Sequence, residues 1–123
     1  MPICSDLWRG RRPLFYGYLL AVMALATYPL RQPVGSPNDK VNHIAAFAVY
    51  YLFGRWAYPE ARPYRLLLSG LAYGALIELI QLFIPYRSCE LGDLLADAAG
   101  LAIAWAAVLS YQSLQKERRS RAS

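Results

Sequence analysis

Four long apolar runs, separated by short polar segments, dominate the pattern along the chain. They cover residues 13–30, 41–58, 64–86 and 91–111. A membrane-spanning helix needs about 20 mostly apolar residues, and all four runs come close to that length. The segments between them are rich in proline and other turn-forming residues, which end helices. The pattern therefore predicts an all-α fold, a bundle of four transmembrane helices.

The composition agrees with a membrane protein of one domain. Hydrophobic residues make up 57% of the 123 residues and charged residues 17%, against roughly 25% charged in an average soluble domain. The second run is the weakest, because only fourteen residues separate Lys40 from Arg55, and the flexible stems of these two side chains can reach the water. We expect one membrane domain over residues 1–123, with a basic tail at 112–123.

Small residues predict where the helices pack most closely. Gly70 and Gly74 are four apart, and Ala96, Gly100 and Ala104 repeat the same spacing in the fourth run. Small residues at this interval form one face of a helix and let a neighbouring backbone approach. These two faces are predicted to be contacts between helices.

The basic residues predict the orientation. With the N-terminus in the cytoplasm, the inner segments hold ten Lys and Arg residues and the outer segments only Arg31, Lys40 and Arg87. Lys and Arg concentrate on the cytoplasmic side of bacterial membrane proteins. We therefore expect both termini in the cytoplasm and a multi-pass protein of the bacterial inner membrane. The basic residues form no stripe interleaved with aromatics, so nucleic-acid binding is not expected, and the basic tail is interpreted as a solvated or lipid-facing anchor.

The first run has a second interpretation, a cleaved signal peptide. Basic residues precede the run, and the segment Ala24–Ala26 resembles a cleavage site. The run continues past Ala26 toward spanning length, which favours a retained helix, although both interpretations stay open. Cys4 and Cys89 fall on opposite sides of the membrane under this topology, so no disulfide joins them.

Polar residues gather at the outer ends of three of the runs. Residues three or four apart share one face of a helix, and a carboxylate within a span costs about 2.5 kcal/mol or more, so such residues usually serve a function. Lys40 and Arg87 flank these positions. Simple helix capping by Asp39 or Asp93 is an alternative, as is ordinary packing of His43. The pairs are Asp39 with His43, Glu78 with Gln81, and Asp93 with Asp97.

These motifs, taken in order, resemble the VanZ-like family of small membrane proteins, which is associated with teicoplanin resistance, an antibiotic-resistance trait. The resemblance covers residues 39–100: Asp39-Lys40-x-x-His43, Glu78-x-x-Gln81, Arg87, and Asp93-x-x-Ala-Asp97 followed by Gly100. Relatives commonly carry Asn at the position of Asp97. The resemblance implies four spans and an action on membrane lipids, either a lipid head group or a lipid-linked cell-envelope precursor.

The residue types suit phosphoester cleavage or transfer on such a lipid. We expect His43, oriented by Asp39 or Asp93, to act as general base or nucleophile, and Glu78 to act as general acid. Arg87 and Lys40 suit a phosphate. The expected catalytic residues are His43, Glu78, Asp93 and Asp39, and the expected substrate-binding residues are Lys40, Gln81, Arg87 and Asp97.

Other functions stay open at this stage. The same residues could bind an envelope lipid or a glycopeptide antibiotic without reacting. No cofactor is required by the acid–base interpretation, although the carboxylates and the imidazole are also compatible with Mg²⁺ or Mn²⁺. A small transporter is a third alternative, for which helices interrupted at the midplane are expected. No feature of the sequence indicates an oligomeric state.

Overall fold

Four helices make up the described part of the chain. The computed structural model describes residues 2–27, 37–84 and 91–122, with side chains over 10–27, 40–84 and 91–122. The helices are α1 (Pro2–Thr27), α2 (Pro37–Ala57), α3 (Pro63–Leu82) and α4 (Leu91–Ala122). No strand occurs in these ranges, which confirms the all-α prediction.

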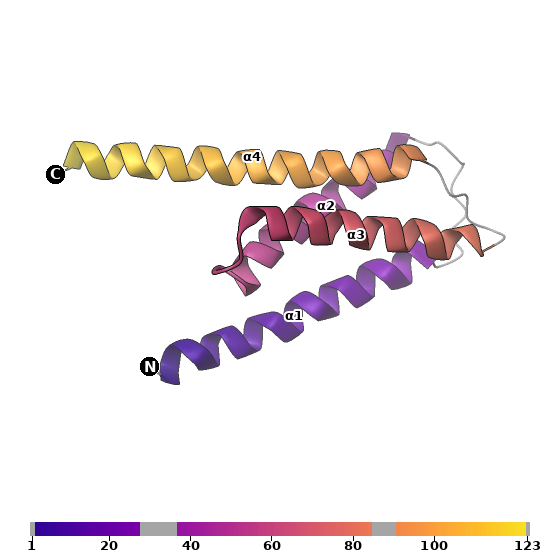
Figure 1. Cartoon of the computed structure of the whole chain (residues 1–123), viewed down its shortest axis with the longest axis horizontal. Coiled ribbons are helices and arrows are strands. Elements are labelled where there is room, and N and C mark those ends of the chain that lie inside the picture. Colours follow the sequence, from indigo (N-terminus) through magenta and orange to yellow (C-terminus); the bar gives the residue numbers. More distant parts are fainter. Residues whose placement is uncertain (1, 28–36, 85–90, 123) are drawn as a thin grey trace.

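The helices run alongside one another with both chain ends on the same side. Figure 1 shows the N- and C-termini at one end, together with the α2–α3 connection, while α2 and α4 begin at the opposite end, where α1 and α3 finish. α4 packs most extensively on α2 and also contacts α3, whereas α1 packs on α2 and α3. Residues at the starts of α2 and α4 therefore lie near the end of α3.

Helix ends differ from the ends of the apolar runs. α1 begins at Pro2 and contains Pro13, where the first run begins, and α4 continues to Ala122, past the end of the fourth run at residue 111. An apolar run marks only the part of a helix that can lie in lipid, whereas the helix itself can continue into water. α3 matches its run more closely at its start, because Arg62 has an extended backbone and Pro63 occupies the first turn, where its missing N–H costs nothing.

Aromatic residues fill much of the interior. Phe15, Phe47 and Tyr51 are almost fully buried. The rings of Phe47, Tyr50 and Tyr73 form a triangle. The Tyr50 centroid lies 6.0 Å from each of the other two, and the Phe47 and Tyr73 centroids are 6.1 Å apart. Flat aromatic side chains provide a large contact area between helices that are widely spaced. This aromatic core joins α1, α2 and α3 and lies beside the polar end of the bundle.

α2 and α4 approach each other at Gly100. A Cβ atom on Gly100 would lie 2.3 Å from the Ile44 carbonyl oxygen and 3.1 Å from the Ala48 nitrogen, both backbone atoms of α2. Ala96 and Ala104, one turn away on either side, are also buried. The predicted small-residue face of the fourth helix is therefore confirmed as the contact with α2. This close approach brings the first turns of the two helices together.

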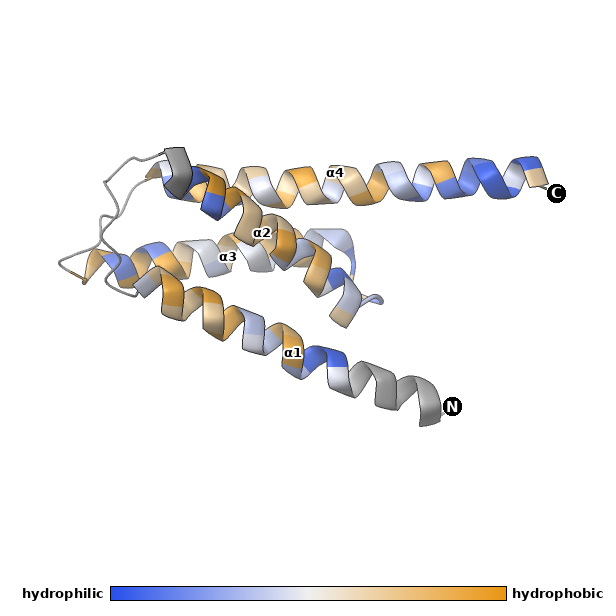
Figure 2. Cartoon of the chain, turned by 180° about the vertical axis from the view of Figure 1, so that it is seen from behind, coloured by the Kyte–Doolittle hydropathy of each residue, from blue (hydrophilic) through white to orange (hydrophobic). Residues whose placement is uncertain are grey.

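Apolar side chains are exposed on all four helices. Examples are Leu20 on α1, Leu52 on α2, Leu68 on α3 and Ile103 on α4, with exposed fractions of 73%, 49%, 61% and 57%. Figure 2 shows hydrophobic colours along the middle of the bundle and hydrophilic ones toward its two ends. Water-facing surfaces rarely carry so many exposed apolar side chains, whereas lipid-facing surfaces do.

Two helices are long and apolar enough to cross a membrane, as judged by length and composition alone. Within the described residues, these are Pro63–Leu82 and Leu91–Ala122. Arginines at positions 11 and 12 lower the hydropathy of α1, and Lys40, His43 and Arg55 lower that of α2. The described residues therefore give two candidate spans where the sequence predicts four.

Candidate functional site

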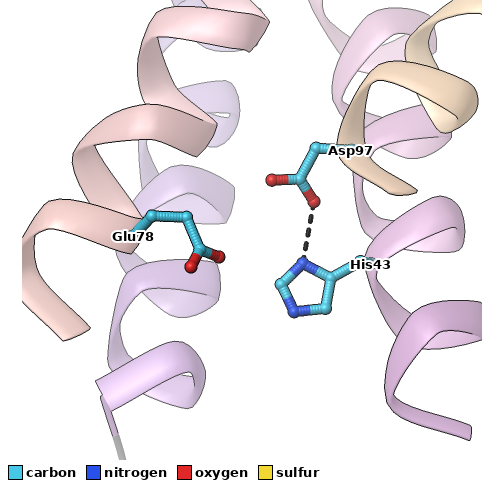
Figure 3. A group of neighbouring side chains, drawn as sticks. All are labelled: His43, Glu78 and Asp97. Carbon is cyan, nitrogen blue, oxygen red and sulfur yellow. Dashed lines mark hydrogen bonds and ion pairs between the residues drawn. The ribbon is translucent and has the colours of Figure 1, made fainter. Parts of the chain in front are cut away.

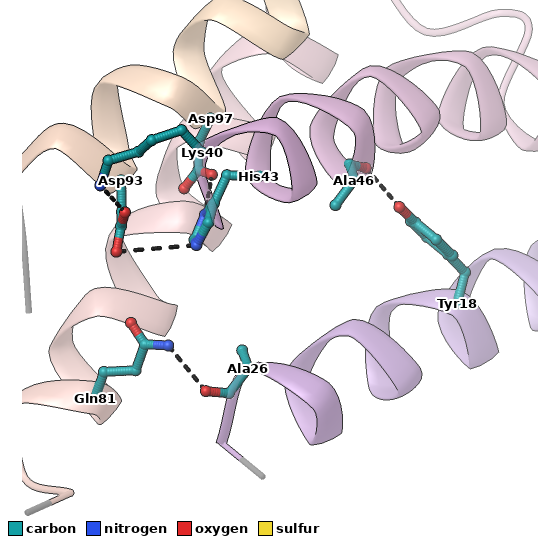
Figure 4. Close-up of polar contacts among 8 residues, drawn as sticks. All are labelled: Tyr18, Ala26, Lys40, His43, Ala46, Gln81, Asp93 and Asp97. Carbon is teal, nitrogen blue, oxygen red and sulfur yellow. Dashed lines mark hydrogen bonds and ion pairs between the residues drawn. The ribbon is translucent and has the colours of Figure 1, made fainter. Parts of the chain in front are cut away.

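Three helices bring polar side chains together at one end of the bundle. α2 contributes Lys40 and His43, α3 contributes Glu78 and Gln81, and α4 contributes Asp93 and Asp97 (Figures 3 and 4). The exposed fraction is 0% for Asp97, 4% for both Asp93 and Gln81, and 7% for Glu78. We call these six residues the polar cluster. Every buried polar or charged residue in the described part of the chain belongs to it.

The imidazole of His43 lies between two carboxylates of α4. Its Nδ1–H donates to Asp97 Oδ1 over 2.8 Å, and its Nε2 lies 3.9 Å from Asp93 Oδ2. The sequence suggested Asp39 or Asp93 as the partner that orients His43. Among the described side chains, Asp97 makes the hydrogen bond to the ring, and the Asp39 side chain lies outside the described part. Asp93 and Asp97 are one α-helical turn apart, and Asp97 lies level with the ring.

Lys40 forms an ion pair with Asp93. The Lys40 ammonium donates to Asp93 Oδ1 in an ion pair that joins the first turns of α2 and α4. The Asp93 side chain is 5% exposed and that of Lys40 30% exposed. The expected role of Lys40 at a substrate phosphate stays a prediction, and in this structure its charge lies against the buried Asp93 carboxylate. The ion pair lies at the outer margin of the polar cluster.

Glu78 faces the His43–Asp97 pair from α3. One ligand atom from each of His43, Glu78 and Asp97 lies within 4.8 Å of the other two, and Figure 3 shows the three side chains converging from separate helices. Gly74, one turn before Glu78, allows this approach. A Cβ atom on Gly74 would lie 2.7 Å from Asp97 Oδ2. From the sequence, Gly74 was predicted only as part of a packing face, and its spacing of four from Glu78 was the signal for its place at the site.

Gln81 ties α1 to the polar cluster. Its Nε2 donates to the Ala26 carbonyl oxygen over 2.9 Å, at the end of α1 (Figure 4). Its Oε1 is buried without a hydrogen-bond partner among the described residues, as is Asp97 Oδ2. The Gln81 amide nitrogen therefore has a structural role, whereas its oxygen could accept a hydrogen bond from a ligand.

Two of the predicted site residues cannot be placed. Arg87 lies outside the described residues, as does Cys89. Asp39 belongs to the first turn of α2, but its side chain lies outside the described part. The polar cluster therefore comprises six of the eight predicted residues.

The chain was also compared with known proteins. No curated protein and no solved structure matches it significantly. A family model described as VanZ/LLP1 matches residues 15–112, a range that contains α2 and α3 and all six residues of the polar cluster. Together with the two apolar helices, the match indicates a membrane protein. Because the match covers well over half of the chain, this protein belongs to the VanZ/LLP1 family.

Proposed function

We propose that the chain crosses the bacterial inner membrane four times, with both termini in the cytoplasm and the polar cluster at the outer face. Three observations support this topology. Both termini lie at the same end of the bundle (Figure 1), and all four helices expose apolar side chains. Ten of the 13 Lys and Arg residues belong to segments on the side of the termini. At that end, Arg11 lies over the Trp56 ring and Arg12 over the Tyr58 ring, as in the aromatic belts at membrane–water interfaces.

We also infer that α1 is retained. Phe15 is 4% exposed and belongs to the core, and the Tyr18 hydroxyl donates to the Ala46 carbonyl oxygen over 2.5 Å. The Tyr73 hydroxyl donates to the carbonyl oxygen of Leu19. Cleavage after Ala26 would remove these contacts and the acceptor of the Gln81 bond.

The topology predicts which cysteine reacts from outside. In intact cells, a membrane-impermeant maleimide is expected to label Cys89 and not Cys4, because the lipid bilayer shields the cytoplasmic face. Mass spectrometry of the purified protein measures labelling at each position, and permeabilised cells are the control in which both cysteines react. Labelling of Cys4 in intact cells would reverse the proposed orientation.

The chemistry that we propose is cleavage or transfer of a phosphoester on a lipid head group. The observation that carries it is the hydrogen bond from His43 to the buried Asp97, which orients the ring and favours a basic Nε2. His43 would take a proton from water or an acceptor alcohol as its oxygen attacks phosphorus. The phosphorus–oxygen bond to the leaving group then breaks, and Glu78 in its acid form protonates the departing oxygen.

One observation favours a second function, binding without reaction. A phosphate site requires a cation, but the cation of the polar cluster, Lys40, already pairs with Asp93, and Arg87 lies outside the described residues. The polar cluster can bind a lipid-linked precursor through hydrogen bonds alone. This binding protein would retain lipid without changing it.

Turnover by purified protein tests the proposal. In vesicles, we expect the chain to release a head group or phosphate from a polyprenyl diphosphate or a glycerophospholipid, and mass spectrometry of the lipids measures this release. His43→Gln keeps an amide donor toward Asp97 but has no basic nitrogen, so turnover should fall by about 100-fold or more. Glu60→Gln, at the other end of the bundle, is the matched control and should turn over normally.

The outcomes separate the two functions. Equal turnover by wild type and His43→Gln would contradict the assignment of His43 as base. Saturable lipid binding by the wild type, with no product from any lipid tested, would replace the enzyme with the binding protein.

A further inference from the structure

Three chemically different donor groups converge in the polar cluster. The His43 imidazole, the Glu78 carboxylate and the Asp97 carboxylate come from three separate helices, and their ligand atoms lie within 4.8 Å of one another. Donor atoms bound to one ion at about 2.1 Å lie roughly 3.0–3.4 Å apart in octahedral or tetrahedral geometry. His43 Nδ1 and Asp97 Oδ1 are already 2.8 Å apart. Only Glu78 has to move closer, and its side chain has three rotatable bonds with which to do so.

Two buried oxygen atoms beside these donors point to a ligand. Asp97 Oδ2 and Gln81 Oε1 have no hydrogen-bond partner among the described residues, and both side chains are at least 96% buried. Oδ2 faces Gly74, one turn from Glu78 on the same helix, and Figure 3 shows one Asp97 oxygen turned toward α3. Buried oxygen atoms without a partner are costly unless something binds them.

The buried Asp97 carboxylate favours a cation beside it. Asp97 is 0% exposed, and its Oδ2 has no hydrogen-bond partner among the described residues. The Lys40 ammonium pairs with Asp93 rather than with Asp97. Ionised groups within a membrane bundle are usually compensated by a partner of opposite charge.

The types of donor narrow the choice of ion. Carboxylates suit Mg²⁺, Ca²⁺ and Mn²⁺, whereas an imidazole suits Zn²⁺ and other transition metals. A site with one imidazole and two carboxylates matches Zn²⁺ or Mn²⁺ better than Mg²⁺, which prefers oxygen donors and retains most of its water.

We propose that His43, Glu78 and Asp97 bind one divalent transition-metal ion, Zn²⁺ or Mn²⁺. The inference rests on the proposed function only for the position of the site at the outer face. With the ion bound, the His43 proton would move from Nδ1 to Nε2, so that Nδ1 becomes a ligand, and the ion would activate water in place of the imidazole. Asp93 then keeps its pairing with Lys40 and lies outside the ligand set.

The test measures metal rather than activity. Purified full-length protein in detergent is stripped with EDTA, incubated separately with Zn²⁺, Mn²⁺ and Mg²⁺, desalted, and analysed by inductively coupled plasma mass spectrometry. We expect about one equivalent of Zn²⁺ or Mn²⁺ per chain, and a higher melting temperature with the metal bound. Mg²⁺ should be lost during desalting.

Single substitutions locate the ion. His43→Ala and Glu78→Ala should each lose stoichiometric binding, while circular dichroism shows that the helices are retained. Glu60→Ala and Glu117→Ala remove carboxylates far from the site and are the matched controls, which should bind like the wild type. Asp97→Asn keeps an oxygen ligand without the charge, so its affinity should fall by roughly 10- to 100-fold without vanishing.

The results distinguish this inference from the proposed function. Folded wild-type protein that retains none of the three metals would overturn the metal site, as would full binding by both His43→Ala and Glu78→Ala. Turnover of a lipid by such metal-free protein would leave His43 as the base. Stoichiometric metal without turnover of any lipid would keep the metal site and overturn the phosphoester chemistry.

Discussion

Gly100→Ala is expected to destabilise the bundle more than the addition of a methyl group at any other described glycine. The new Cβ would lie 2.3 Å from the Ile44 carbonyl oxygen and 3.0 Å from its carbonyl carbon. Backbone atoms cannot rotate away, so α2 and α4 would have to separate. At Gly70, by contrast, the nearest atoms are side-chain methyl groups of Leu101, which can move. Overpacking of a core costs roughly 1–3 kcal/mol, occasionally more, and we expect Gly100→Ala to exceed the upper value.

Gly17→Ala is the matched control. Gly17 also lies within a helix, but no other side chain or neighbouring helix lies within 4 Å of its Cβ position. Replacement there should be neutral or should stabilise α1 by roughly 0.5–1 kcal/mol, because alanine favours helices. Thermal unfolding of both variants in detergent, followed by circular dichroism, gives the comparison. Similar melting temperatures for the two variants would mean that α2 and α4 do not approach as closely as described.

Asp93→Asn is expected to abolish function, whereas Asp97→Asn, one turn away, should retain it. After Asp97→Asn, the new amide oxygen can still accept the hydrogen bond from His43 Nδ1, and relatives commonly carry Asn there. Asp93 pairs with the Lys40 ammonium and lies 3.9 Å from His43 Nε2. An asparagine at position 93 would remove the carboxylate that pairs with Lys40. It would also remove a negative charge beside His43 Nε2, the proposed base. We expect turnover to fall by about 100-fold or more in Asp93→Asn, and to stay within about tenfold of wild type in Asp97→Asn with Mn²⁺ or Zn²⁺ in excess.

A double substitution separates stability from chemistry at Asp93. Breaking a buried ion pair costs about 3–5 kcal/mol when both partners are buried, and the 30% exposure of Lys40 reduces this figure. Lys40→Gln combined with Asp93→Asn removes both charges, so the melting temperature should recover while turnover does not. Lipid turnover and thermal unfolding of all variants at equal membrane abundance provide the measurements. Equal losses of turnover in Asp93→Asn and Asp97→Asn would show that Asp97 is needed as a carboxylate.

The convergence of the polar cluster was predictable from the sequence. Spacings of three and four placed Glu78 with Gln81 and Asp93 with Asp97 on single helix faces, and the alternation of helices brought those faces to one end. The pairings within the cluster were not predictable. They depend on the relative depth of neighbouring helices, which the contact at Gly100 sets in three dimensions. As a result Asp97, one turn deeper than Asp93, makes the hydrogen bond to His43 Nδ1.

The helix ends and the role of Gln81 were also beyond sequence reasoning. Hydropathy marks the part of a helix that suits lipid, so it gave no sign that α4 continues to Ala122. The acceptor of the Gln81 bond is a backbone carbonyl, that of Ala26. Every residue offers the same backbone carbonyl group, whatever its side chain, so the sequence contains no mark of which one is used.

In the proposed topology, the length of α4 connects the site mechanically with the cytoplasm. Its 32 residues form one uninterrupted helix, about 48 Å long at 1.5 Å per residue, whereas the hydrocarbon layer is roughly 30 Å thick. α4 also runs past the α2–α3 connection in Figure 1. A helix that carries Asp93 and Asp97 near one end and Arg119 and Arg121 near the other would act as a lever. A tilt of α4 by a few degrees at the site would move its C-terminal end sideways, and a spin label near residue 119 would report this movement.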